Sequence, residues 1–141
     1  MSESLDNQIK TGSCLCGQVK FETSGPLRPA VACHCTQCRK ASGHFTAATA
    51  TSPENLHLIC DTGLKWYRSS AVAQRGFCGD CGSTLFWKPD SGDRISVYVG
   101  SIDDQTNLVL DSHIFVEEKG DYYQVEDGAP QYQKGGANLS V

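Results

Sequence analysis

Hydrophobic and polar residues alternate along several short segments of this 141-residue chain, which is the pattern of half-buried β-strands. The alternation is clearest at residues 18–22, and residues 45–51 are rich in β-branched side chains before a turn at 52–55. Apolar residues at 30–32 lead into a cluster of cysteines, which we expect to begin at a strand end. Further short strands are predicted at 56–60, 64–67, 84–87, 95–99, 113–116 and 122–125.

One short helix is predicted directly after Cys35, and no segment of the chain shows a long helical period. Thr36 is the candidate N-cap of this helix, and Gly43 is the candidate residue at its end. The predicted fold class is therefore mainly β, with at most short helical turns. Its strands are so short that we expect bound metal to help hold them together.

The length of the chain predicts a single domain, which we place at residues 12–132. Residues 1–11 are expected to form a flexible lead, and residues 133–141 a flexible tail. No apolar run approaches the roughly 20 residues that cross a bilayer, so no membrane association is expected. Residues 1–10 lack the apolar core of a secretory signal, and we therefore expect a cytoplasmic protein with reduced thiols.

The charge pattern argues against nucleic-acid binding. The formal net charge is −4, and lysine and arginine are scattered singly, with the densest pair at Arg39 and Lys40. Bound zinc makes the charge more negative, because a site with four thiolates carries about −2 and a site with three about −1. Nucleic-acid-binding zinc proteins instead carry basic stripes that neutralise phosphates.

Seven of the eight cysteines fall into three groups with metal-ligand spacing. A C-x-C pair lies at 14–16, a C-x-C-x-x-C triplet at 33–38 and a C-x-x-C pair at 78–81. These spacings suit tetrahedral zinc better than crossed disulfide bridges. A disulfide framework is the alternative, since an even number of cysteines can pair completely. The expected reducing compartment disfavours it.

The three groups divide between two metal ions. Two distant pairs together supply the four sulfurs of a closed, structural zinc site: Cys14, Cys16, Cys78 and Cys81. Cys33, Cys35 and Cys38 supply only three sulfurs, which leaves a position for water or substrate and predicts a catalytic zinc. In the alternative partition, Cys60 or a histidine completes this set and both zinc ions are structural. Cys60, at the end of an apolar strand, is itself predicted to be a small buried hydrophobic residue.

The cysteine motifs also carry a resemblance to a protein family. They read GSCLCG at 12–17, CHCTQCRKASG at 33–43 and RGFCGDCGS at 75–83, followed by HIFV at 113–116 and DGAPQY at 127–132. Together they resemble the glutathione-dependent formaldehyde-activating enzyme family, which also includes centromere protein V. The resemblance implies a compact fold of coiled antiparallel β-sheets with two zinc ions, divided between the cysteines as above. Tyr122-Tyr123 stands where the family commonly has a tryptophan, and Cys60 lies outside the family's ligand pattern.

The resemblance further implies a carbon–sulfur lyase that adds glutathione to formaldehyde, giving S-hydroxymethylglutathione. The expected partners are then small thiol and carbonyl compounds, with glutathione as co-substrate and zinc lowering the pKa of the bound thiol. His34, His44 and His113 are candidates for proton transfer by residue type. Each also has a structural alternative. His34 lies between two ligands and should point away from the metal, His44 could simply be an exposed residue, and His113 could be a hydrogen-bonded strand histidine. A non-catalytic zinc module that binds a thiol compound or a protein partner is the alternative function.

Overall fold

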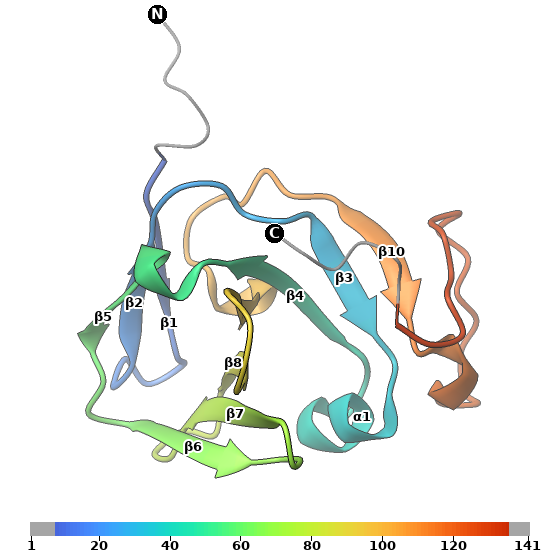
Figure 1. The fold of residues 1–141 in the computed structure, drawn as a ribbon, viewed down its shortest axis with the longest axis horizontal. Coiled ribbons are helices and arrows are strands. Elements are labelled where there is room, and N and C mark those ends of the chain that lie inside the picture. The colour runs from blue at the N-terminus through green and yellow to red at the C-terminus, as the bar shows by residue number, and fades with distance from the viewer. Residues whose placement is uncertain (1–7, 136–141) are drawn as a thin grey trace, which may run out of the picture.

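The computed structural model describes residues 8–135. These residues form two open β-sheets, which confirms the prediction of a mainly β fold (Figure 1). The smaller sheet has the order β1-β2-β5, and the larger has the order β10-β3-β4-β9-β8-β7-β6. The strands of the smaller sheet are β1 (Lys10–Ser13), β2 (Lys20–Thr23) and β5 (Leu56–Cys60). Those of the larger sheet are β3 (Ala30–Cys33), β4 (Thr46–Thr51), β6 (Leu64–Arg68), β7 (Ala73–Cys78), β8 (Thr84–Pro89), β9 (Ile95–Tyr98) and β10 (Leu110–Ile114).

Neighbouring strands are antiparallel except at one edge of the larger sheet, where β10 pairs with β3 in parallel. The sheets are thus antiparallel as expected, apart from this one parallel pairing. The larger sheet curls from β3 and β4 round to β6 and β7 (Figure 1). As a result, β7 comes close to the segment that follows β3, although the two lie far apart in the strand order.

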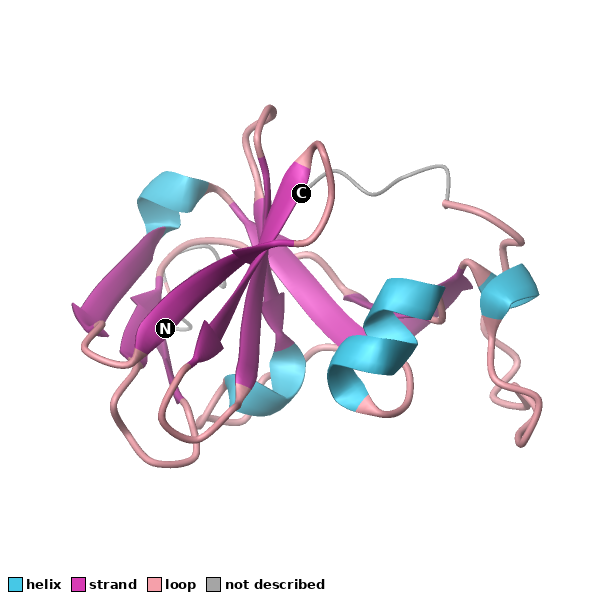
Figure 2. Ribbon diagram, turned by 90° about the horizontal axis from the view of Figure 1, so that it is seen from below, coloured by secondary structure: helices cyan, strands magenta, loops and turns pink. Residues whose placement is uncertain are grey.

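In the part of the chain that the structure describes, helical structure is confined to short pieces, as the strand-dominated view in Figure 2 makes plain. These pieces are α1 (Thr36–Ser42) and the 3₁₀ turns η2 (Pro53–Asn55), η3 (Val99–Ser101) and η4 (Val116–Glu118). Within residues 8–135, none of the helices has the length and apolar character that spanning a bilayer requires.

The predicted helix forms, but its N-cap is Cys35 and not Thr36. The Cys35 backbone is extended, and its sulfur accepts a hydrogen bond from the backbone N–H of Cys38. Thr36 is already inside the helix, where its hydroxyl and its backbone N–H both donate to Glu118 Oε1 at 3.0 Å. Gly43 ends the helix in the left-handed conformation, as predicted, with its N–H bound to the carbonyl of Arg39.

Most of the predicted strands form, including those at 18–22 and 30–32, which overlap β2 and β3. The segments at 45–51, 56–60, 64–67, 84–87 and 95–99 correspond to β4, β5, β6, β8 and β9. Neither β1 nor β7 was predicted as a strand. The predicted strand at 122–125 is wrong, because these residues form turns and loop, and the one at 113–116 lies at 110–114 and gives way to a 3₁₀ turn.

The apolar core lies between the two sheets. Phe21 of β2 and Phe86 of β8 meet edge to face, with ring centroids 5.2 Å apart. Seven further buried residues surround them, two of which are cysteines: Cys14, Val19, Cys78, Leu85, Ile95, Val97 and Ile102. The apolar core therefore joins the two sheets next to the point where Cys14 and Cys16 meet Cys78 and Cys81.

The C-terminal segment folds back along β10. His113 donates its backbone N–H to Pro130 at 2.9 Å and accepts one from Tyr132 at 2.8 Å, and Phe115 donates to Lys134 at 3.0 Å. Most of the predicted lead and of the predicted tail, residues 1–7 and 136–141, lies outside the described residues.

Gly12 gives a direct test of this core, because Phe21 lies across it from the paired strand. A Cβ at Gly12 would lie 2.1 Å from Phe21 Cζ, and the Phe21 ring is buried against Phe86. We expect Gly12→Ala to lower the free energy of unfolding by about 1–3 kcal/mol. The matched control is Gly100→Ala, where a Cβ meets nothing within 4 Å. Urea unfolding at equal metal content measures both, and equal midpoints would contradict the packing described.

Candidate functional site

Seven cysteines converge on two points of the fold, and the sulfur atoms of each group lie within 4.8 Å of one another. The four-cysteine cluster contains Cys14, Cys16, Cys78 and Cys81, and the three-cysteine cluster contains Cys33, Cys35 and Cys38. These are the two sets into which the sequence spacing divided the cysteines. Cys60 belongs to neither.

The four-cysteine cluster has the dimensions of a zinc–thiolate cage. The Cys16 sulfur lies 3.8 Å from the Cys14 sulfur and 3.8 Å from the Cys78 sulfur. A tetrahedron with zinc–sulfur distances of about 2.3 Å has edges of about 3.8 Å. A disulfide would instead bring two sulfurs to about 2.05 Å. The donor set therefore fits a tetrahedral metal ion, and it does not fit the alternative of a disulfide framework.

Two tight turns form this cluster. One lies between β1 and β2, where Gly17 has a φ of +85° and the Cys14 sulfur accepts a hydrogen bond from Val19 N at 3.2 Å. The other lies between β7 and β8, where Gly82 has a φ of +81° and donates to the Cys78 carbonyl at 2.8 Å. Glycine adopts this left-handed backbone without the strain that a Cβ would cause. The cluster thus joins the smaller sheet to the larger one.

The three-cysteine cluster is built from one continuous stretch. Cys33 ends β3, Cys35 caps α1 and Cys38 lies buried in its first turn. Within residues 8–135, no further cysteine, histidine or carboxylate joins these three sulfurs at ligand distance. Cys60, which the alternative partition would use, lies at the end of β5 and donates its thiol to the Gln18 carbonyl at 3.3 Å. Cys60 is also half-exposed, so the prediction that it is buried is wrong.

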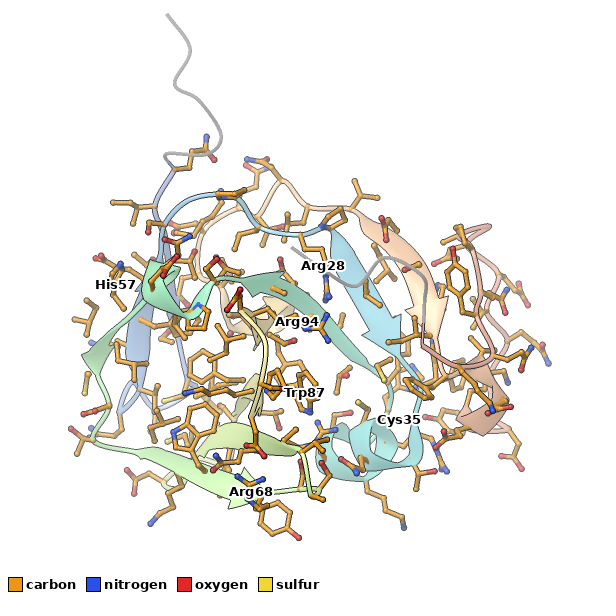
Figure 3. All side chains as sticks on the ribbon, in the orientation of Figure 1. Arg28, Cys35, His57, Arg68, Trp87 and Arg94 are labelled. Carbon is orange, nitrogen blue, oxygen red and sulfur yellow. The ribbon has the colours of Figure 1, made fainter. Side chains whose placement is uncertain are left out.

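A cavity of about 630 Å³ opens beside the three-cysteine cluster, inside the curl of the larger sheet. All three cysteines line it, together with residues from both sides of the curl, among them Arg28, Thr46, Arg75, Trp87, Arg94, Tyr98 and Glu118. Figure 3 shows Cys35, Trp87, Arg28 and Arg94 around this hollow. The four-cysteine cluster contributes only Cys14 to a second hollow of about 500 Å³.

Arg75 of β7 connects the cysteines to the cavity wall. Its guanidinium donates to the Tyr98 hydroxyl at 2.8 Å and approaches the Cys38 sulfur at 3.5 Å. Hydrogen bonds from Cys33 and Cys35, with smaller effects from Thr46 and Arg75, lower the pKa of Cys38. Burial raises the pKa of Tyr98, so its phenol stays protonated near neutral pH. The cavity therefore presents a cation and a neutral hydroxyl donor beside the three sulfurs.

The predicted candidates for proton transfer lie elsewhere, since neither His34, His44 nor His113 lines the cavity. His34 is fully buried and points away from the sulfurs, as expected for a residue between two of them. His44 is exposed, with its ring nitrogen 2.6 Å from the Tyr122 hydroxyl.

His34 belongs to a hydrogen-bonded chain that runs to the surface. The Tyr123 hydroxyl bonds to His34 Nδ1, His34 Nε2 lies 2.9 Å from His113 Nδ1, and His113 Nε2 lies 2.8 Å from Asp127 Oδ2. Burial, reinforced by the charge of His113, lowers the pKa of His34 to about 4. The chain of hydrogen bonds connects the segment after β3 with β10 and the C-terminal loop.

Comparison with known proteins gives three consistent findings. A family model described as glutathione-dependent formaldehyde-activating enzyme matches residues 9–118. A Schizosaccharomyces pombe protein, named as an uncharacterized lyase, is 27% identical over 114 residues, which cover 79% of this chain and 82% of that protein. A crystal structure of a Rhodobacter sphaeroides protein has a TM-score of 0.58 and 22% identity, covering 69% of this chain and 91% of that one. The last match shows a shared fold.

Proposed function

The chain belongs to the glutathione-dependent formaldehyde-activating enzyme family, and from this premise we propose that it is a zinc-dependent carbon–sulfur lyase. In the forward direction it adds a thiol such as glutathione to formaldehyde or a related small carbonyl compound. One observation carries the proposal: the cysteine cluster with only three sulfurs is the one whose members all line the 630 Å³ cavity. A cavity of this size accommodates a substrate as large as a tripeptide.

We assign one zinc ion to each cluster. Cys14, Cys16, Cys78 and Cys81 hold the structural ion, and Cys33, Cys35 and Cys38 hold the catalytic one. Zinc with three protein ligands keeps a position for an external group, where it lowers the pKa of a thiol and polarises a carbonyl. Residues 12–132 form the zinc-binding domain in this proposal, and the reduced thiols fit a cytoplasmic setting.

The residues of the cavity wall supply the remaining chemistry. A bond forms between the thiol sulfur and the carbonyl carbon, the π pair of the carbonyl moves onto oxygen, and that oxygen takes up one proton. The thiol proton leaves to solvent, so the reaction is balanced. We assign the incoming proton to Tyr98, whose oxygen accepts a hydrogen bond from Arg75 while its own O–H remains to donate. Solvent then reprotonates Tyr98.

Exchange spectroscopy by NMR tests the proposal on the zinc-loaded chain at equilibrium with glutathione and formaldehyde. We expect the protein to accelerate exchange between free and hydroxymethylated glutathione, and we expect Cys35→Ala to abolish the acceleration. Cys60→Ala is the matched control, because Cys60 lies outside both clusters, and it should retain the wild-type rate. Exchange no faster than in protein-free solution would exclude the lyase and favour a binding module. A fully active Cys35→Ala variant would contradict the assigned site.

The role of Tyr98 predicts a second result in the same assay. Tyr98→Phe removes the donated proton while leaving the ring in place, so we expect the exchange rate at saturating substrate to fall about 100-fold. Zinc content, measured by mass spectrometry of the metal, should stay at the wild-type value. Tyr67→Phe is the control, since Tyr67 is exposed on β6. A Tyr98→Phe variant with the wild-type rate would show that another group supplies the proton.

A further inference from the structure

A buried pair of histidines lies behind the three-cysteine cluster. His34 stands between Cys33 and Cys35 in the sequence, and its side chain is fully buried away from the cavity that the cysteines line. His113 of β10 is only 3% exposed, and its Nδ1 lies 2.9 Å from His34 Nε2. A buried imidazole needs a partner for each ring nitrogen, because an unpaired polar atom loses its hydration without compensation.

The chain of hydrogen bonds through this pair has one consistent direction. Asp127 is a carboxylate near neutral pH, because the hydrogen bond from His113, followed by the one from the backbone N–H of Ala129, lowers its pKa. A carboxylate only accepts, so His113 donates from Nε2, and in the neutral ring Nδ1 then accepts from His34 Nε2. His34 Nδ1 in turn accepts from the Tyr123 hydroxyl. All four ring nitrogens are thus satisfied, and the His34 ring is held in one orientation.

The backbone at His34 is fixed as well. Its N–H donates to the Ile114 carbonyl at 3.0 Å, which continues the parallel pairing of β3 with β10 (Figure 1). The sulfurs of Cys33 and Cys35 project together into the three-cysteine cluster, while the His34 ring projects away from it, as alternation along extended backbone requires. An anchored His34 therefore fixes the direction in which its two neighbours project.

The three-cysteine cluster has a physical need for such support. Three thiolates drawn from one six-residue stretch repel one another, so an unsupported stretch would spread its sulfurs apart when no metal is bound. Ligands that are held in place before the metal arrives bind it more tightly. The four-cysteine cluster is formed by the β1–β2 and β7–β8 turns, on elements that do not carry this chain, so it offers a comparison within the same molecule.

We propose that His113 and Asp127 are positioning residues for the metal site, which hold His34 so that Cys33 and Cys35 are set to bind the ion. This inference rests on the proposed function, because that function assigns a zinc ion to the three-cysteine cluster. It gives the C-terminal loop, which carries Tyr123 and Asp127, a share in retaining this ion.

Competition between the zinc-loaded full chain and a chromogenic chelator tests the inference, because it measures the dissociation constant of each ion without any substrate. The ion that is missing from Cys38→Ser is the one at the three-cysteine cluster. We expect His113→Leu to weaken binding of this ion about ten- to a hundredfold, the usual effect of removing a group that supports a metal ligand. The ion of the four-cysteine cluster should keep its affinity. His113→Asn should restore part of the loss, because its amide oxygen takes the place of Nδ1 and accepts from His34.

Two controls separate positioning from a general loss of stability. His57→Leu replaces an exposed histidine of β5 and should leave both dissociation constants unchanged. Gly12→Ala disturbs the core at Phe21 and should not single out the ion of the three-cysteine cluster. Tyr123→Phe repeats the test from the other end of the chain if His113→Leu does not fold. It removes the donor to His34 Nδ1, and we expect it to weaken the same ion several-fold.

Three results would overturn the inference: equal binding of the ion by His113→Leu and the wild type, equal weakening of both ions, or a wild type that holds no ion at the three-cysteine cluster. The same criteria apply to Tyr123→Phe. Selective weakening without accelerated exchange in the assay above would keep the positioning role and exclude the lyase. Accelerated exchange with unchanged zinc affinity in the variants would keep the lyase and overturn the positioning role.

Discussion

Strand β7 is the constraint on which both cysteine clusters depend. Its last residue, Cys78, is fully buried in the core and belongs to the four-cysteine cluster. Three residues earlier, Arg75 reaches across the curl of the larger sheet to Cys38 of the other cluster. The four-cysteine cluster therefore fixes the end of the strand that carries the cation beside the three-cysteine cluster. Loss of the four-cysteine cluster would leave the end of β7 unfixed, and the cavity wall that Arg75 forms would then move with this strand.

The two clusters differ because they are assembled in different ways. In the four-cysteine cluster, two turns each supply a pair of sulfurs from opposite sides, so the four sulfurs can surround a metal ion completely. In the three-cysteine cluster, all three sulfurs come from one stretch between the end of β3 and the first turn of α1. This stretch surrounds a metal position from one side only, and the other side faces the cavity. His34, the nearest further ligand in sequence, points away, because side chains alternate along extended backbone. Its ring is bound instead to Tyr123 and His113.

Much of the fold and the grouping of the cysteines followed from local patterns. Spacing alone sorted seven cysteines into the two groups that the structure brings together, and the family resemblance is confirmed by a match over residues 9–118. Strand β1 escaped prediction because it is an edge strand in which only Gly12 is buried. Strand β7 escaped because Arg75 and Gly76 fill buried positions that apolar residues normally occupy. The aromatic pair at 122–123 favours a strand by composition, but its hydroxyls bind histidines from a loop.

The cavity wall could not be predicted, because Arg28 precedes β3, Arg75 belongs to β7 and Tyr98 belongs to β9, and the three meet only when the larger sheet curls. The central claim is that one cluster is closed and the other open to a thiol. Cadmium-113 NMR of the cadmium-loaded chain, titrated with glutathione below the level that removes metal, tests this most directly. The account predicts two resonances, of which only the one that is missing in Cys38→Ser moves when glutathione is added. Two resonances that both stay unmoved would contradict it.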